Sequence, residues 1–272
     1  MQSGSKLQIR GNEARSRRFV VSYFFFSNLN NEVQTLKCSS AFVEVFFLVL
    51  NCPVATTIPR FRTGTYTTPV KNQGYCGSCW AFSATEQIES DYMRQVGKQY
   101  ILSPQQMTSC TPYVFGGGCN GGFTENGFEY AEAGMETEAS YPYTSGTAGI
   151  TGSCKSDSSK FVVKVTSAGY TTVSSSASGE SKMASYVSST GPLSVCVDAS
   201  DWSSYTGGIM SKCGTSVDHC VQAVGINTSG GYWKVRNSWG TSWGESGFIR
   251  LSYGSNTCAI ASDANYASTA SM

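Results

Sequence analysis

Eleven cysteines in a chain of 272 residues, beside a single histidine, constrain this protein more than any other feature. Such a cysteine content is typical of proteins that fold in an oxidising compartment and are held by disulfide bridges. Because the count is odd, at least one cysteine stays unpaired if every bridge is internal. His219 is the only candidate for imidazole chemistry, and a lone histidine excludes zinc sites that need two or more. No metal ion or other cofactor is expected.

The charge is divided unevenly along the chain. The net charge of +1 argues against a nucleic-acid-binding protein, which would need a clearly basic domain. Residues 1–62 hold eight basic and three acidic side chains, whereas residues 63–272 hold eleven basic and fifteen acidic ones. We therefore expect an atypical N-terminal extension, 1–62, and a folded domain, 63–272. No apolar run is long enough to span a bilayer, so no membrane-spanning helix is expected.

The N-terminal extension contains two apolar clusters, 19–26 and 41–50, among arginine-rich turns. The second cluster is too short to span a bilayer and starts too late for an ordinary signal peptide. Three interpretations stay open. The segment is a remnant of a signal anchor, or a buried strand pair or poorly ordered extension, or a product of a wrong translation start or a retained intron.

Helices are predicted in the first half of the folded domain and mainly strands in the second. Apolar side chains recur at helical spacing over 78–95, and Ser103 before Pro104 is a typical N-cap followed by proline. Two more helices are expected at 123–133 and 179–189. This order predicts an α+β fold with two lobes. Strands are expected at 161–165, 193–197, 220–226, 232–236 and 248–251.

The densest run of chemically active residues lies at 73–83, where a glycine-rich loop leads into the first predicted helix. Cys79 stands at this entry, where backbone N–H groups and the helix dipole stabilise a thiolate. A thiolate needs a base or an ion-pair partner, and His219 is the only imidazole. Asn237 can orient that imidazole through its amide oxygen. Gln73, together with the Cys79 backbone N–H, can donate to an oxyanion.

Several motifs of this chain resemble those of the papain family of cysteine peptidases, of the cathepsin L or plant-papain type. A cysteine motif of this kind, with a cysteine of low pKa, is known from papain itself. The resemblance covers about Pro69 to Tyr266, and it implies a helical left lobe, a β-barrel-like right lobe and an active-site cleft between them. The motifs are Cys76-Gly-Ser-Cys79-Trp80, Gly118-Cys119-Asn120-Gly121-Gly122, Asp218-His219 and Asn237-Ser-Trp239-Gly-Thr-Ser-Trp243-Gly.

The resemblance implies a role for each candidate. Cys79 would be the nucleophile of a cysteine endopeptidase, and His219 would act first as general base and then as acid. Asn237 would orient the imidazole, and Gln73 would donate to the oxyanion. Attack by the thiolate would give a thioester acyl-enzyme that water hydrolyses. An extended substrate would be bound by Gly121, Gly122, Phe123, Thr124, Cys196, Asp218, Cys220, Trp239 and Asp263.

The resemblance also pairs the cysteines of the domain. We expect Cys196 and Cys220, on two predicted strands, to form a bridge rather than to stay as two buried thiols. Cys79 would then be the free thiol of the domain, while Cys38 and Cys52 have no family counterpart. The family pattern implies three further bridges: Cys76–Cys119, Cys110–Cys154 and Cys213–Cys258.

Specificity and partners are further expectations from the resemblance. Asp263 would lie on the floor of the pocket for P2, the second substrate residue before the scissile bond, and would pair with arginine there unless it turns to solvent. Family exopeptidases that trim C-termini use additional histidines, which this chain lacks, so an endopeptidase is favoured. We expect extended polypeptide substrates, cystatin-like inhibitors, a monomer, and a lysosomal, vacuolar or secreted location.

Other functions stay open at this point. One is a catalytically silent homologue, which would use the same fold for binding. It stays open because the family's helical prosegment is not recognisable in residues 1–62. Cys76-x-x-Cys79 has the spacing of a redox pair. Transpeptidase or ligase activity would share the same acyl-enzyme.

Overall fold

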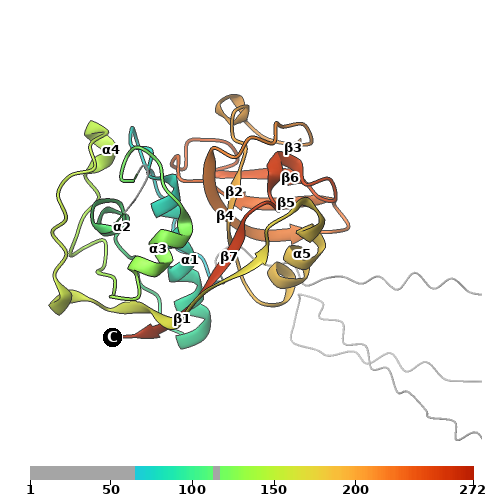
Figure 1. Ribbon diagram of the computed structural model, residues 1–272. Coiled ribbons are helices and arrows are strands. Elements are labelled where there is room, and N and C mark those ends of the chain that lie inside the picture. Colours follow the sequence, from blue (N-terminus) through green and yellow to red (C-terminus); the bar gives the residue numbers. More distant parts are fainter. Residues whose placement is uncertain (1–64, 113–116) are drawn as a thin grey trace, which may run out of the picture. The chain divides into compact units, whose positions relative to one another are not determined.

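The computed structural model describes residues 65–112 and 117–272, which form a helical lobe and a sheet lobe (Figure 1). These residues belong to one compact unit, Ala55–Met272. The predictions for the extension at 1–62, including those for Cys38 and Cys52, lie outside the described residues. No helix in the described part of the chain is both long and apolar enough to span a membrane.

The helical lobe contains α1 (Cys79–Val96), α2 (Pro104–Cys110), α3 (Thr124–Tyr130) and the short α4 (Ser145–Ala148). Helix α1 confirms the prediction for 78–95 to within one residue at each end. Helix α2 begins as predicted, because the Ser103 hydroxyl accepts a hydrogen bond of 2.9 Å from the Gln106 N–H. Helix α3 is shorter than predicted: after Tyr130 the chain continues as a tighter turn, where the Ala133 N–H donates to the Tyr130 carbonyl.

The core of the helical lobe is formed by the apolar face of α1. Trp80, Ala84, Ile88 and Tyr92 follow one another at helical spacing and are all buried. They belong to a single cluster with residues from α2 and α3, among them Met107 and Phe128. This packing fixes the position of the helix that begins at Cys79.

The sheet lobe is built on one sheet of seven described strands in the order β1-β7-β2-β4-β5-β6-β3. All neighbours are antiparallel except β3 and β6. All five predicted strands are present, β1 being much longer than expected, whereas β3 and β7 were not predicted. The strands are β1 (Val163–Ser174), β2 (Leu193–Val197), β3 (Ile209–Met210), β4 (His219–Asn227), β5 (Tyr232–Arg236), β6 (Phe248–Ser252) and β7 (Ala264–Ser271).

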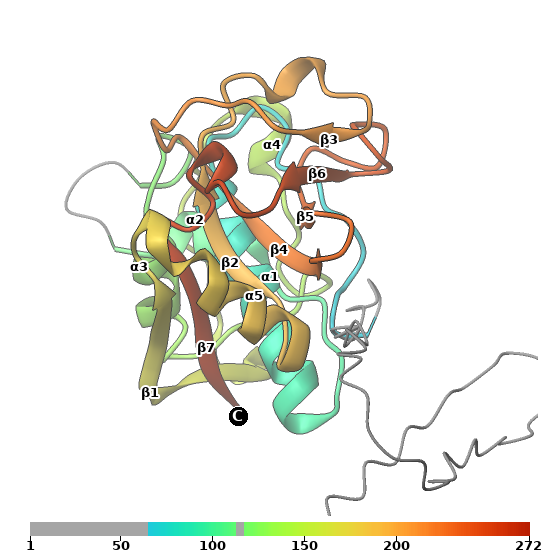
Figure 2. The ribbon, with the colours of Figure 1, turned by 90° about the vertical axis from the view of Figure 1, so that its right-hand side faces the viewer.

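Helix α5 (Glu180–Ser189), predicted at 179–189, packs against the sheet (Figure 2). Its Met183 and Val187 join the buried core of the sheet lobe. Single turns of 3₁₀ helix complete the described structure: Ser158–Lys160, Ala177–Gly179, Trp202–Ser204 and Thr257–Ala259.

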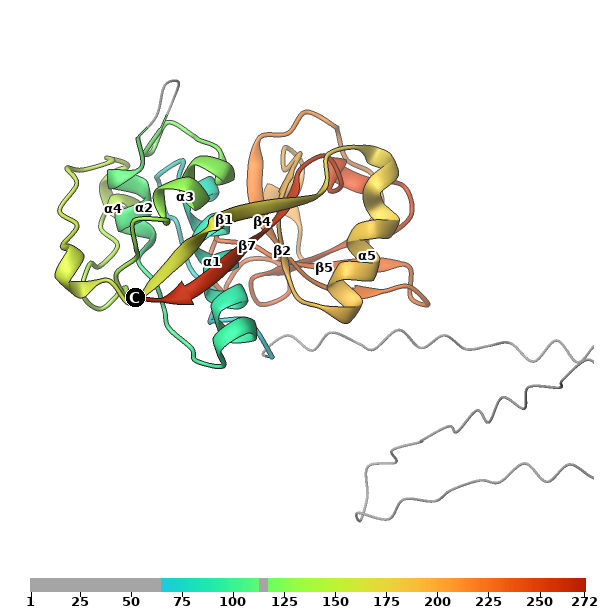
Figure 3. The same cartoon turned by 60° about the horizontal axis from the view of Figure 1, so that its bottom comes forward.

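The pair of strands β1 and β7 links the two lobes (Figure 3). Val163 and Val165 of β1 and Ala267 of β7 belong to the core of the helical lobe, although both strands are part of the sheet. At the end of β7, the Ser271 hydroxyl lies 2.8 Å from the Tyr92 hydroxyl of α1. The helix that carries Cys79 is therefore held from both lobes.

All four expected disulfides are present in the structure. Cys196 and Cys220 are direct partners on β2 and β4, so their bridge crosses the sheet between neighbouring strands. Cys79 is the free cysteine among the described residues. Because Cys76 is bonded to Cys119, it does not form a redox pair with Cys79. The other bridges are Cys76–Cys119, Cys110–Cys154 and Cys213–Cys258.

Candidate active site

Cys79 is the first residue of α1, and the loop before it is fixed by close backbone contacts. The Gly77 N–H donates to the Cys119 carbonyl at 3.0 Å, beside the Cys76–Cys119 bridge. A Cβ atom on Gly77 would come within 2.5 Å of the Cys119 carbonyl oxygen, so only glycine fits there. The loop therefore delivers Cys79, half-buried, to the N-terminal end of the helix.

His219 lies between Cys79 and Asn237. It is the first residue of β4, is buried, and forms a side-chain hydrogen bond with Cys79. Its Nε2 atom lies 2.8 Å from the Asn237 Oδ1 atom, just beyond the end of β5. The Asn237 oxygen also accepts a hydrogen bond of 2.8 Å from the Ser238 N–H, which fixes its orientation. Three separate elements thus bring the side chains of Cys79, His219 and Asn237 together in one row.

The pKa values of Cys79 and His219 shift in opposite directions. Burial raises the pKa of the Cys79 thiol, but the hydrogen bond and charge of His219 and the backbone N–H groups of Cys220 and Trp80 lower it below its usual value. Burial lowers the pKa of His219, but Cys79, Asn237 and Asp218 raise it above its usual value. The two side chains therefore favour a thiolate–imidazolium pair.

Two tryptophan rings pack against the imidazole, and a third packs against both of them. The ring centre of Trp239 lies 5.0 Å from that of His219, and Trp202 meets the imidazole edge-on at 6.0 Å. Trp243 is partly buried and stacks on Trp202. Because His219 and Asn237 are both buried, the hydrogen bond between them lies away from solvent, which strengthens it. Trp202 belongs to no sequence motif and was not predicted as part of the site.

Gln73 is buried beside this row of side chains. Its side-chain oxygen accepts a hydrogen bond of 2.7 Å from the Ser238 hydroxyl, and its side-chain nitrogen donates to the Cys76 carbonyl at 3.0 Å. An amide nitrogen carries two hydrogens, so this bond leaves one N–H group for a substrate oxygen.

The expected substrate-binding residues differ in exposure. Gly122 lies against Trp80, where a Cβ atom would come within 2.6 Å of the ring, so this backbone can pass close to the helix only as glycine. Phe123 is 62% exposed, whereas Thr124, the first residue of α3, is fully buried. Asp218 is exposed, and its carboxylate accepts a hydrogen bond of 2.8 Å from the Ala199 N–H.

Asp263 is partly buried and does not turn freely to solvent. It accepts a hydrogen bond of 2.6 Å from the Asn265 side chain, and it is hydrogen-bonded to the Glu125 carboxyl group. Burial, together with the negative charge of Glu125, raises the pKa of Asp263 to about 6. Glu125 was missed by the sequence analysis because no motif points to it, although it directly follows Thr124.

A model of the family described as papain family cysteine protease matches residues 58–268 of this chain. The chain belongs to the papain family. This papain-family chain is 39% identical over 237 residues to digestive cysteine proteinase 2 of Homarus americanus, covering 84% of the chain and 71% of that protein. It is 43% identical over 210 residues to a cathepsin L-like proteinase of Fasciola hepatica, covering 74% of the chain and 62% of that protein.

A solved structure of a papain-family protease is also similar. The bromelain protease from Ananas comosus, in complex with the E64 inhibitor, matches with a TM-score of 0.65 and 36% identity, over 77% of this chain and 97% of that one. The expected papain-like α+β fold is thereby confirmed. Cysteine endopeptidase activity is the function that the family and its relatives support, and none of them favours a silent homologue.

Proposed function

We propose that the papain-like domain is a cysteine endopeptidase in which Cys79 is the nucleophile, His219 the proton carrier and Asn237 the residue that orients the imidazole. One observation carries this proposal: the three side chains form a hydrogen-bonded row although they come from separate elements. The opposite pKa shifts of Cys79 and His219 support it, because they favour the reactive ion pair.

Acylation follows from this geometry. The Cys79 thiolate attacks the carbonyl carbon of the scissile peptide bond, and the electrons of the carbonyl double bond move onto the oxygen. That oxyanion accepts hydrogen bonds from the Cys79 backbone N–H and from Gln73. Because His219 uses Nε2 toward Asn237, its Nδ1 proton passes to the leaving amine. The carbon–nitrogen bond then breaks and a thioester remains on Cys79.

Deacylation uses the same groups in reverse. The neutral imidazole of His219 takes a proton from a water molecule, whose oxygen attacks the thioester carbonyl carbon. The carbon–sulfur bond breaks, the product leaves as a carboxylic acid, and the Cys79 thiolate is restored beside the imidazolium. Transfer of the acyl group to an amine instead of water would give the transpeptidase or ligase reaction.

Substrate and partners belong to the same proposal. The backbone of Gly121 and Gly122 would pair with an extended polypeptide as with a neighbouring strand. Cystatin-like inhibitors would occupy the same surface, and the domain would act as a monomer. The four disulfides support a lysosomal, vacuolar or secreted location, where the redox conditions preserve them.

The direct test is labelling of the full chain with the epoxide E64. We expect one inhibitor molecule per chain, attached to Cys79, as read by intact mass and by peptide mapping. A catalytically silent homologue would remain unlabelled under conditions in which a papain-family control is fully labelled.

Preference at P2 provides a second test, which concerns specificity. With the pKa of Asp263 raised to about 6, the carboxyl group is protonated at lower pH and ionised at higher pH. The ratio of kcat/KM for an Arg-Arg substrate to that for a Phe-Arg substrate should therefore rise as the pH increases through about 6. Asp263→Asn should remove this rise and lower the ratio about tenfold, the size expected for a charged hydrogen bond.

Asp157→Asn is the matched control for this measurement, because Asp157 is a surface carboxylate in an exposed pair with Lys160. It should leave both the ratio and its pH dependence unchanged. An unchanged ratio in Asp263→Asn would show that Asp263 does not contact the P2 side chain, without affecting the assignment of Cys79.

A further inference from the structure

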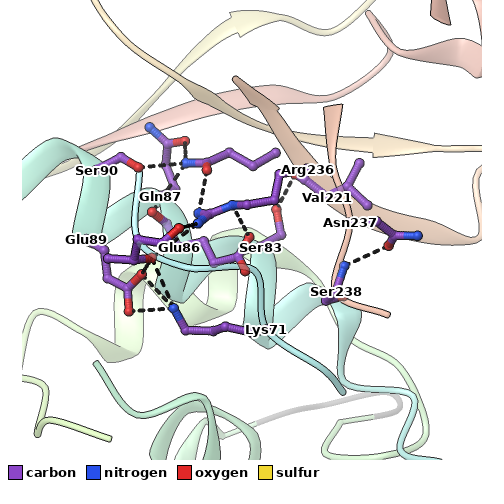
Figure 4. A network of polar contacts seen from close by, with 12 residues as sticks. Lys71, Ser83, Glu86, Gln87, Glu89, Ser90, Val221, Arg236, Asn237 and Ser238 are labelled. Atoms are coloured by element: carbon purple, nitrogen blue, oxygen red, sulfur yellow. Dashed lines mark hydrogen bonds and ion pairs between the residues drawn. The ribbon is translucent and has the colours of Figure 1, made fainter. Parts of the chain in front are cut away.

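The face of α1 that meets the sheet is polar, although it is buried. Ser83, Glu86, Gln87 and Ser90 recur at helical spacing, and all four are buried. Buried helix faces are normally apolar, as the opposite face of α1 is. The polar side chains of this face therefore need hydrogen-bonding partners on the sheet. Figure 4 shows the face together with one of these partners, Arg236.

The partners form one row across three strands of the sheet. Gln222 of β4 is directly paired in register with Ser194 of β2 and with Arg236 of β5. Each of the three reaches a different residue of the polar face of α1. The contacts are Ser194 with Ser83 at 2.7 Å, Gln222 with Ser90 at 3.0 Å, and Arg236 with Glu86 at 3.2 Å.

Arg236 provides the guanidinium group of this row, and its side chain is completely buried. Its Nε atom lies 3.2 Å from the Glu86 carboxylate, and its Nη2 atom donates to the Gln222 side chain at 2.6 Å. Its Nη1 atom donates to the Thr68 carbonyl at 2.5 Å. These contacts matter because an unpaired charge in the interior is strongly destabilising.

The charged side chains next to the Arg236–Glu86 pair are held by an ion pair and hydrogen bonds of their own. Lys71 and Glu89 form a neighbouring ion pair of 2.8 Å, and the Thr68 hydroxyl contacts both Glu89 and Arg236. Burial raises the pKa of Glu86, while the charges of Arg236 and Lys71 oppose that rise. Of these two positive charges, Arg236 contributes more to favouring the ionised form of Glu86.

Both residues of the Arg236–Glu86 pair lie close in sequence to a member of the catalytic row, which is formed by Cys79, His219 and Asn237. Arg236 directly precedes Asn237, and Glu86 lies on the same helix as Cys79, seven residues or about 10 Å along its axis. We propose that the Arg236–Glu86 pair is a positioning device, which fixes β5 against α1 and so places the imidazole at the thiol. The inference rests on the proposed function of the catalytic row.

An ion pair suits this task better than apolar packing would. Apolar contacts tolerate small shifts between a helix and a sheet, whereas movement of α1 relative to β5 would separate the buried guanidinium of Arg236 from the Glu86 carboxylate. Buried ionic groups can fix one arrangement in this way even where they add little stability. A displacement of about 1 Å at the reacting atoms is enough to cost about 100-fold in rate.

The test compares single and double variants of the full chain. Arg236→Met or Glu86→Gln alone leaves an uncompensated partner in the interior, so each should lower the thermal midpoint of unfolding. The double variant removes both charges and should recover much of the midpoint. Its kcat should nevertheless fall about 100-fold, with KM within about threefold of the original, because the reacting groups are misplaced.

The pH dependence of Cys79 alkylation by iodoacetamide separates positioning from folding. At about pH 5 an ordinary thiol is protonated and does not react. The rate of alkylation at this pH therefore measures how much of Cys79 is kept as a thiolate by His219. In the double variant this reaction should slow at least about tenfold, whereas Asp157→Asn should not change it. A double variant with the original kcat and alkylation profile would show that the pair serves stability alone.

A conservative variant covers the case in which the double variant does not fold. Arg236→Lys keeps the charge but cannot reach Thr68, Gln222 and Glu86 together, because lysine lacks the planar fork. We expect it to fold and to lose about tenfold in kcat, and an unchanged kcat would overturn the proposal. If the unaltered chain is not labelled by E64, the proposed function fails instead, which is a different result.

Discussion

Replacement of Cys79 by serine should lower kcat/KM by about 10⁴-fold or more, as removal of the nucleophile does in other hydrolases. A serine hydroxyl has a far higher pKa than a thiol, and His219 would not convert it to the anion. Substrate binding should change little, since the serine side chain is nearly the same size. The measurement is steady-state hydrolysis of a Phe-Arg substrate by the full chain.

His219→Ala should cost a similar factor, because the two side chains act as one unit. The ion pair exists between the lowered pKa of Cys79 and the raised pKa of His219. In the unaltered chain, activity should therefore fall in acid, where the thiolate is protonated, and in alkali, where the imidazolium loses its proton. In His219→Ala, alkylation of Cys79 should begin only as the pH approaches the ordinary thiol range.

The alternatives give different outcomes in this experiment. Hydrolysis that survives in Cys79→Ser would contradict the assignment of the nucleophile. Alkylation in His219→Ala with the same pH profile as in the unaltered chain would contradict the ion pair. Asp157→Asn again serves as the control, since it removes an exposed carboxylate from an ion pair outside the site.

Removal of the Cys196–Cys220 bridge should lower the free energy of unfolding by about 3 kcal/mol, from the loop entropy of a separation of 24 residues. Replacing both cysteines by alanine avoids new thiols. The bridge also holds the residue after His219, and the Cys220 N–H contributes to the lowered pKa of the Cys79 thiol. We therefore expect kcat to fall together with stability. Denaturant unfolding and steady-state kinetics measure the two effects.

The Cys110–Cys154 bridge provides the matched control, with a separation of 44 residues and no contact with the catalytic row. Its double alanine variant should lose a comparable free energy of unfolding but keep the pH profile of Cys79 alkylation. Free-thiol titration of the unreduced, unfolded chain gives an independent check. If both Cys196 and Cys220 react, the bridge does not form in solution.

The residues of the row formed by Cys79, His219 and Asn237 could be picked out because they stand in short local motifs. Cys79 follows a glycine-rich loop at a helix start, and His219 has no competitor in the chain. Helix α2 was predictable for the same local reason, since Ser103 and Pro104 have clear preferences at a helix start. The structure adds that Cys79, His219 and Asn237 meet.

The features that were missed depend on partners distant in sequence. Strand β7 consists of small and polar residues without an apolar run, and it is a strand because β1 and β2 pair with both its edges. Glu125 becomes part of the candidate P2 pocket through Asp263, far along the chain. Trp202 reaches His219 only after the sheet has formed.

Strand β7 also affects how the folded domain can unfold. Its Ala264 belongs to the core of the sheet lobe, and its Ala267, three residues later, belongs to the core of the helical lobe. Any fluctuation that peels this strand away must open both cores at once. The two lobes are therefore not independent folding units but one cooperative structure. Partial unfolding cannot then separate Cys79 on α1 from His219 on β4.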